Sequence, residues 1–268
     1  MTNRLWSFST DALRDELGFE RLEIINDFTA VALALPHLGA NDRLTVGGGL
    51  PVSDRPLAVL GPGSGLGTSG LIPTGLGWQP LTSEGGHMTM GPVTERESAV
   101  LQKMRRQFDH ISAERCLSGP GLVNLYNALA MIDGVRAVSY TAAQITDPAT
   151  AVHDPLCLEA TAMFCEMLGT VASNLALVLG AQGGVYIAGG IVPRLGARFA
   201  ESGFRSRFET KGRFSDYLAA IPTYVVTHPL PAFLGCAAAL AYKAADVRFT
   251  IAPSVSVTPL ALGEPISC

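Results

Sequence analysis

The feature that most constrains the fold is a glycine-dense stretch between two apolar runs, LAVLGPGSGLGTSGLIP at residues 57–73. Two apolar segments joined by closely spaced glycines favour a β-hairpin over a linker, because glycine permits a tight turn between paired strands. Because glycine has no side chain, the backbone N–H groups of such a stretch can also approach phosphate oxygens closely. The Ser64 hydroxyl can donate a further hydrogen bond to them. The stretch is not a Walker loop, since no Gly-Lys-Ser/Thr follows, and it lacks the strand-to-helix setting of a dinucleotide fingerprint.

Short apolar strands and longer helices are expected along the rest of the chain, which predicts an α/β fold. LEIIN at residues 22–26 predicts a buried strand, and FTAVALAL at 28–35 predicts a helix that Pro36 ends. The junction between them is the kind of crevice where α/β folds place their chemistry. Further helices are expected after Thr10, from the capping box at Thr94 to about Phe108, from Ser118, over 155–179 and over 233–245, and further strands at 185–189 and 223–228.

Composition excludes several classes of protein. The chain has 268 residues, 48% of them hydrophobic, which indicates a globular protein. A net charge of −4 and a pI near 5.7 offer no basic surface for a nucleic acid. Five scattered cysteines without a CxxC pair fit free thiols in a reducing cytosol. The stretch between Glu166 and Arg194 is uncharged, but its pattern changes from helix to strand, so we interpret it as buried core and not as a membrane span.

Asn26 and Asp27 stand at the end of the strand expected at 22–26. Both residue types commonly begin helices, so an N-cap or Asx turn explains them without any chemistry. The functional alternative is a general base at Asp27, which accepts a proton from a sugar hydroxyl while Asn26 hydrogen-bonds a neighbouring one. A carboxylate against the attacking hydroxyl is a standard part of phosphoryl transfer.

Three further segments combine glycine with polar residues. Glu84 and His87 flank a pair of glycines in SEGGH, which permit close approach of a small ligand, whereas a lone histidine is usually structural. Glu114, in SAERC, reads as a surface carboxylate when taken alone. Glycines bracket the strand in GGVYIAGGIVP at residues 183–193, and they suit either a flat wall for a purine or tight strand–helix packing.

Taken together and in this order, these segments resemble the bacterial glucokinases of the hexokinase–actin–acetate kinase superfamily. INDFTA, GPGSGLG, SEGGH, SAERCLSGPGLVNLY and GGVYIAGGIVPR carry the resemblance, which extends from near residue 1 to about Lys243. It implies a two-lobed α/β fold of the ribonuclease H-like type with the substrates in the cleft, and an incomplete small lobe. The implied division is 1–37 plus 228–246 for the small lobe, 38–227 for the large lobe, and a disordered tail at 247–268.

The resemblance also implies an activity, the transfer of a phosphoryl group from ATP to glucose, with Mg²⁺ brought by ATP, in a cytoplasmic homodimer. Asp27 matches the catalytic base of the family. Gly235 matches a position in the helix that closes the hinge region. Asn26, Asp27, Glu84, His87 and Glu114 match the residues that bind glucose. Gly61, Gly63, Ser64, Gly65 and Gly67 match the second phosphate loop, and Gly189, Gly190 and Ile191 match the adenosine wall.

One family part is expected to be missing. Glucokinases begin with a strand and an Asp-x-Gly-Gly-Thr-Asn loop, the first phosphate loop, and nothing of that type precedes residue 10. Several explanations of the missing loop stay open: a wrong start, a fragment, a truncated gene product, or a partner that supplies the missing strands. The alternatives to a glucokinase are a sugar-binding remnant without catalysis and a kinase for another hexose.

Overall fold

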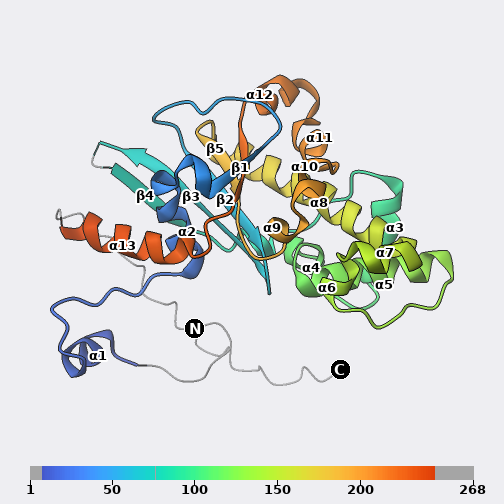
Figure 1. Cartoon of the computed structure of the whole chain (residues 1–268), viewed down its shortest axis with the longest axis horizontal. Coiled ribbons are helices and arrows are strands. Elements are labelled where there is room, and N and C mark those ends of the chain that lie inside the picture. The colour runs from blue at the N-terminus through green and yellow to red at the C-terminus, as the bar shows by residue number, and fades with distance from the viewer. Residues whose placement is uncertain (1–7, 76, 245–268) are drawn as a thin grey trace, which may run out of the picture.

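A computed structural model of the chain describes residues 8–75 and 77–244 (Figure 1). Its centre is a six-stranded sheet in the order β1-β6-β5-β2-β3-β4. The strands β2, β5 and β6 are parallel to one another, while β1 and the β3–β4 meander run antiparallel to their neighbours. The strands are β1 (Arg43–Val46), β2 (Leu57–Pro62), β3 (Leu66–Thr74), β4 (Gly77–Thr82), β5 (Gly184–Ile187) and β6 (Thr223–Val226).

Helices cover both faces of this sheet (Figure 1). Because side chains alternate along a strand, Ala58 and Leu60 of β2 face one hydrophobic cluster while Leu57 and Val59 face the other. The first cluster is formed with the larger helical layer, α3 (Glu95–Met104), α4 (Ala113–Cys116), α5 (Gly119–Asp133), α6 (Ala142–Ile145), α7 (Pro148–His153), α8 (Pro155–Leu179), α9 (Val192–Leu195), α10 (Ala197–Ala200), α11 (Phe204–Glu209) and α12 (Ser215–Ala219). The second is formed with α2 (Asp27–Ala34) and α13 (Pro231–Ala244), and α1 (Thr10–Glu16) buries no residue.

Most of the expected elements are confirmed. The hairpin at 57–73 is β2–β3, and the helix expected over 155–179 is α8 with the same bounds. The helix α8 is long and apolar enough to cross a bilayer, but 67% of its most apolar window is buried in the protein. Together with β5, which is buried along its whole length, it bears out the reading of the uncharged stretch as core.

The strand expected at residues 22–26 is wrong. These residues are extended between α1 and α2 without a strand partner in the described part of the chain, and the edges of the sheet are β1 and β4. Side chains hold the segment instead: Arg21 Nη1 donates to the Leu240 carbonyl of α13 at 3.1 Å, and Ile25 packs against the cluster of α2 and α13. The apolar run is therefore only partly covered: Ile25 packs against helices, and Ile24 is 43% exposed.

Two smaller differences concern the ends and edges of elements. Ser9, not Thr10, caps α1, because its hydroxyl accepts from the Ala12 N–H. The edge strands β1 and β4 were not expected, since β1 has four residues and β4 contains Pro80. The tail assigned to 247–268 lies outside the described residues.

The two stretches assigned to a small lobe meet in the structure. The helices α2 and α13 pack against each other, and α2 also contacts β3. Gly235 is buried at this contact, where a Cβ would overlap the carbonyl oxygen of Ala30. The C-terminal helix therefore fixes the first helix of the site against the sheet, while the division into two lobes stays a prediction.

We predict that Gly235→Ala destabilises the protein by about 1–3 kcal/mol, because overpacking outweighs the better helix propensity of alanine. Chemical denaturation measures this change. Gly91→Ala is the matched control, since a Cβ there meets open space and Gly91 has no positive φ. Equal stability of the two variants would contradict the close approach of α2 and α13.

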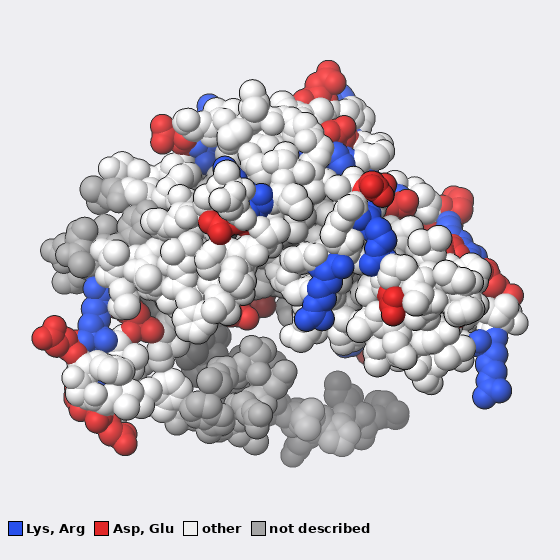
Figure 2. Space-filling view, in the orientation of Figure 1, with Lys and Arg blue, Asp and Glu red and all other residues white. Residues whose placement is uncertain are grey.

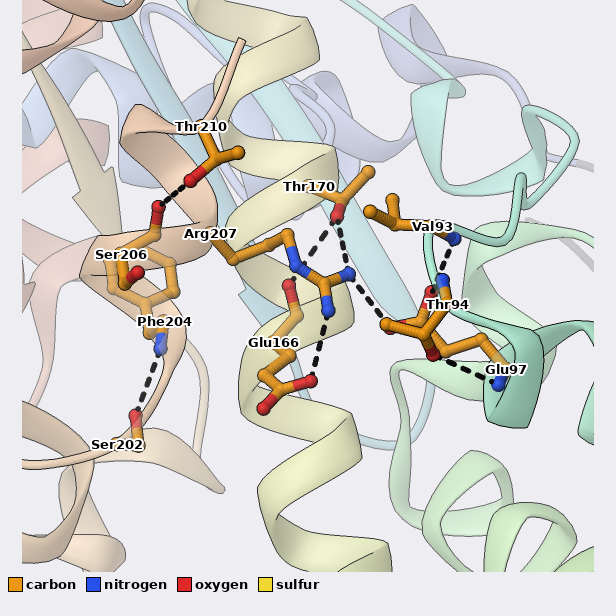
Figure 3. Close-up of polar contacts among 10 residues, drawn as sticks. All are labelled: Val93, Thr94, Glu97, Glu166, Thr170, Ser202, Phe204, Ser206, Arg207 and Thr210. Atoms are coloured by element: carbon orange, nitrogen blue, oxygen red, sulfur yellow. Dashed lines mark hydrogen bonds and ion pairs between the residues drawn. The ribbon is translucent and has the colours of Figure 1, made fainter.

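A buried ion pair joins three elements of the helical layer (Figure 3). Arg207 of α11 donates to Glu97 of α3 at 2.7 Å and to Glu166 of α8 at 3.0 Å. Glu97 is 1% exposed, and its second oxygen accepts from the N–H groups of Val93 and Thr94 in the expected capping box. The pair therefore fixes the loop before α3 as well as the contact between α8 and α11.

We predict that Glu97→Gln costs about 3–5 kcal/mol of unfolding free energy, because it removes a charge that a buried guanidinium needs while it keeps the shape of the side chain. Urea denaturation gives the value. Asp133→Asn, which breaks the exposed pair with Arg96, serves as the comparison and changes stability far less. If Glu97→Gln lowers the unfolding free energy no more than Asp133→Asn does, the network does not stabilise the contacts between α3, α8 and α11.

Candidate active site

The turn between β2 and β3 is the centre of the site. Gly61 pairs with Gly67 and Pro62 with Leu66, so Gly63, Ser64 and Gly65 form the tip. The Gly63 N–H donates to the Gly65 carbonyl at 2.8 Å, and the Ser64 side chain is exposed. The tip is thus a narrow backbone surface with a single side chain, a hydroxyl.

The first segment to reach the hairpin is the start of α2. The ring of Phe28 lies where a Cβ at either Gly61 or Gly67 would be. Only glycine at these paired positions lets the aromatic ring sit directly on the hairpin backbone. The contact places Asn26 and Asp27, which immediately precede Phe28, next to the base of the tip.

Asn26 is the N-cap of α2. Its Oδ1 accepts from the N–H groups of Phe28 at 2.8 Å and Thr29 at 3.1 Å, which leaves its amide NH₂ as a donor. Asp27 is the first helical residue, and its Oδ1 also accepts from Phe28 N–H at 2.8 Å. Both side chains are exposed. The two residues can therefore cap the helix and still bind a substrate, because one oxygen of Asp27 and the side-chain nitrogen of Asn26 are not used by the cap.

The second segment is the short 3-10 helix η3 (Gly85–His87). The Ser83 hydroxyl lies 3.0 Å from the Thr68 hydroxyl of β3, and Gly86 closes on the Leu66 carbonyl so tightly that a Cβ would overlap it. Glu84 and His87 project from this segment with 79% and 62% of their side chains exposed and with Nε2 and Oε2 3.9 Å apart.

The third segment is α4, which carries Glu114. Glu114 Oε2 accepts from the N–H of Leu66 at 2.9 Å, and the Ala113 N–H donates to the Met88 carbonyl just after η3. Glu114 and His87 line one cavity of about 380 Å³. Polar side chains complete its wall: Gln107, Asp109, His110 and Ser112 from the segment before α4, and Arg115 from α4 itself, which lies over the ring of Phe108.

The three segments therefore meet at two consecutive residues. Glu114 and Gly86 contact Leu66, and Phe28 contacts Gly67, whose Cα lies about 3.8 Å further along the chain. The structure gathers His87 and Glu114 in one cavity and brings Asn26 and Asp27 to the same hairpin. Asn26, Asp27 and Glu84 are not in the lining of that cavity.

A second cavity, of about 520 Å³, is also lined by a residue of the hairpin tip. Gly63 of the tip and Gly190–Ile191 after β5 form part of its wall, and Gly189 has a φ of 82° because it passes over the Pro62 carbonyl. Gly189 is therefore needed for close packing against the hairpin backbone, while Gly190 lines the cavity, so the purine wall and tight packing both stay open as explanations of the glycines after β5. The remaining lining is Gly119, Leu122, Ala142, Ala143, Thr146, Asp147, Pro148, Arg194 and Arg198.

Among the described residues, no cysteine lines either cavity. Cys116 lies two residues from Glu114 but is fully buried, and burial, assisted by the charge of Glu97, raises the pKa of its thiol to about 12. A protonated thiol is a poor nucleophile at neutral pH. Cys116, Cys157, Cys165 and Cys236 are all free thiols, as expected.

A protein-family model described as Glucokinase matches residues 1–243. The chain belongs to the glucokinase family. It is 55% identical over 238 residues to a glucokinase of Paramagnetospirillum magneticum, which covers 88% of this chain and 74% of that protein. It is 53% identical over 240 residues to a glucokinase of Aromatoleum aromaticum, which covers 90% of this chain and 72% of that protein.

A solved glucokinase structure shares the fold. The glucokinase from an Antarctic psychrotroph superposes with a TM-score of 0.82 at 38% identity, over 87% of this chain and 73% of that one. The α/β fold of the glucokinase family, expected from the ordered motifs, is therefore confirmed. The matches cover about three quarters of these relatives, and the roles of the individual residues stay predictions.

Sequence reasoning missed part of both cavities. It assigned no role to the loop at 107–110 or to the residues at 142–148, because a short polar loop gives no periodic signal. Arg194 and Arg198 were also missed. Arg194 is the last residue of GGVYIAGGIVPR. Its position four residues after Gly190 was the signal that could have identified it as a residue of the nucleotide cavity.

We predict that Glu114→Ala destabilises the chain by about 1–2 kcal/mol, because it removes the acceptor for the Leu66 N–H. Glu114→Gln retains an acceptor of the same reach and should remain closer to the wild type. Thermal and chemical unfolding measure the difference. Identical losses in both variants would show that the hydrogen bond to the hairpin does not hold α4 in place.

Proposed function

We propose that the protein transfers the γ-phosphoryl group of ATP to the 6-hydroxyl of glucose. Membership of the glucokinase family supports the reaction class. The observation that carries the proposal is the meeting of three polar segments at Leu66 and Gly67, beside a hairpin tip that is almost free of side chains. One hexose has enough hydroxyl groups to engage the polar side chains of all three segments.

In the proposed reaction, Asp27 accepts the proton of the attacking hydroxyl. The oxygen of that hydroxyl bonds to the γ-phosphorus as the bond to the bridging oxygen breaks, and ADP leaves. Asp27 suits this role because it is exposed and has one oxygen outside the helix cap. Asn26 would donate its NH₂ to a neighbouring hydroxyl, while Glu84, His87 and Glu114 would bind the remaining ones. General base catalysis of this kind contributes about 10²–10⁴ in rate, and positioning supplies much of the rest.

The nucleotide would lie in the cavity of about 520 Å³, with its phosphates at Gly61, Gly63, Ser64, Gly65 and Gly67 and its adenosine against Gly189, Gly190 and Ile191. The presence of Gly63 and Gly190 in the lining of one cavity supports this placement. Magnesium binds phosphate oxygens, so we propose that it would arrive with ATP and would offset part of the negative charge of the phosphates held at the hairpin tip.

We also propose a cytoplasmic homodimer. Family resemblance supports the dimer, and four free thiols support a reducing compartment. Light scattering coupled to size-exclusion chromatography measures the mass in solution. A species of one chain's mass at micromolar concentration would remove the dimer from the proposal.

We predict that Asp27→Asn lowers kcat for glucose 6-phosphate formation by about 10²–10⁴ while KM for glucose stays within about tenfold, since the amide keeps the shape but cannot take the proton. A coupled assay of the purified full chain measures both constants. Asp216→Asn, another exposed carboxylate in the first turn of a helix, is the control and should keep full turnover.

Three outcomes would contradict parts of the proposal. Normal turnover by Asp27→Asn would remove Asp27 as the base. A wild-type chain that binds glucose but forms no glucose 6-phosphate would favour the sugar-binding remnant, and faster turnover of mannose or N-acetylglucosamine would favour another acceptor.

A further inference from the structure

Arg194 occupies a junction between two cavities. It lies in α9, four residues after Gly190, and it lines the proposed nucleotide cavity. It also lines a neighbouring cavity of about 500 Å³ that extends over Phe28 and Ala188 to the segment at 226–233. The two linings share only Gly190 and Arg194. Arg194 therefore stands between the adenosine wall and the start of α2, where Asp27 lies.

The guanidinium of Arg194 has no partner within the described residues. No carboxylate lies within ion-pair distance of it there, and it makes no side-chain hydrogen bond. The other arginines of the cavities are occupied: Arg198 donates to the Thr146 carbonyl at 2.8 Å, and Arg115 lies over the Phe108 ring at 4.3 Å. Arg194 is thus the cavity arginine that is free to bind a ligand.

The charge of the proposed nucleotide requires such a group. A glycine hairpin and a glycine wall offer N–H dipoles but no positive charge, and the same cavity contains the carboxylate of Asp147. Figure 2 shows basic side chains over the region of α9 and α10 in Figure 1. A guanidinium presents its N–H groups as a planar fork that matches phosphate oxygens.

We infer that Arg194 binds the phosphate chain of the nucleotide and stabilises the charge that develops on the leaving diphosphate. This inference rests on the proposed kinase function, because that function supplies the nucleotide. It assigns Arg198 a different task, since its bond to Thr146 ties α10 to the loop between α6 and α7 and so shapes the cavity. The two arginines should therefore respond differently to ligands with and without phosphates.

Calorimetric titration of the full chain with a non-hydrolysable ATP analogue and with adenosine tests the inference. We predict that Arg194→Met weakens binding of the analogue about tenfold or more, the loss typical of a charge-assisted hydrogen bond, and leaves adenosine binding unchanged. Arg194→Lys should recover part of the loss. Arg198→Met should weaken the analogue and adenosine together.

Three results would overturn the inference: unchanged binding of the analogue by Arg194→Met, an equal loss for adenosine, or no binding of the analogue by the wild type. The titration does not depend on turnover. A wild-type chain that binds the analogue but phosphorylates no glucose therefore refutes the proposed function while the role of Arg194 is still decided.

Discussion

Close contact with the hairpin backbone is the constraint on which the rest of the site depends. Phe28 lies on Gly61 and Gly67, Gly86 closes on the Leu66 carbonyl, and Gly189 passes over Pro62. Each contact requires a position without a Cβ, so the glycines of GPGSGLG are needed for packing as much as for any phosphate. The start of α2, η3 and the stretch after β5 reach the same few residues for this reason, and the first two bring polar side chains with them.

The sheet gives this hairpin a rigid base. Both faces of β2 are buried, one under α8 and its neighbours and the other beneath α2 and α13. The contact of Gly235 with Ala30 links the last described helix to the first helix of the site. A change near the C-terminal end of the described chain therefore acts on Asp27 through the packing of α2, without touching a substrate.

The carboxylates of the protein divide into two groups by their surroundings. Glu97 is buried, and a guanidinium and two N–H groups satisfy its charge, so it holds helices together and has no capacity left for a ligand. Asp27 and Glu84 are exposed and have no Lys or Arg ion-pair partner among the described residues, so a sugar hydroxyl can reach their carboxylates. Burial and ion pairing thus distinguish structural carboxylates from candidate functional carboxylates, whereas residue type does not.

Much of this protein followed from local sequence. Glycine spacing predicted the hairpin, Thr94 and Glu97 predicted a capping box, and a long helix was predicted from about Pro155 to Leu179, where α8 lies, because backbone dihedrals and caps are decided by near neighbours. The ordered motifs also indicated the family. Only the tertiary structure decided that residues 22–26 form no strand, that Glu114 bonds to the hairpin 48 residues away, and that Arg194 lies free between two cavities. Those outcomes depend on which residues far away in the sequence offer a surface for burial or a hydrogen-bond partner. The local sequence carries no information about such distant partners.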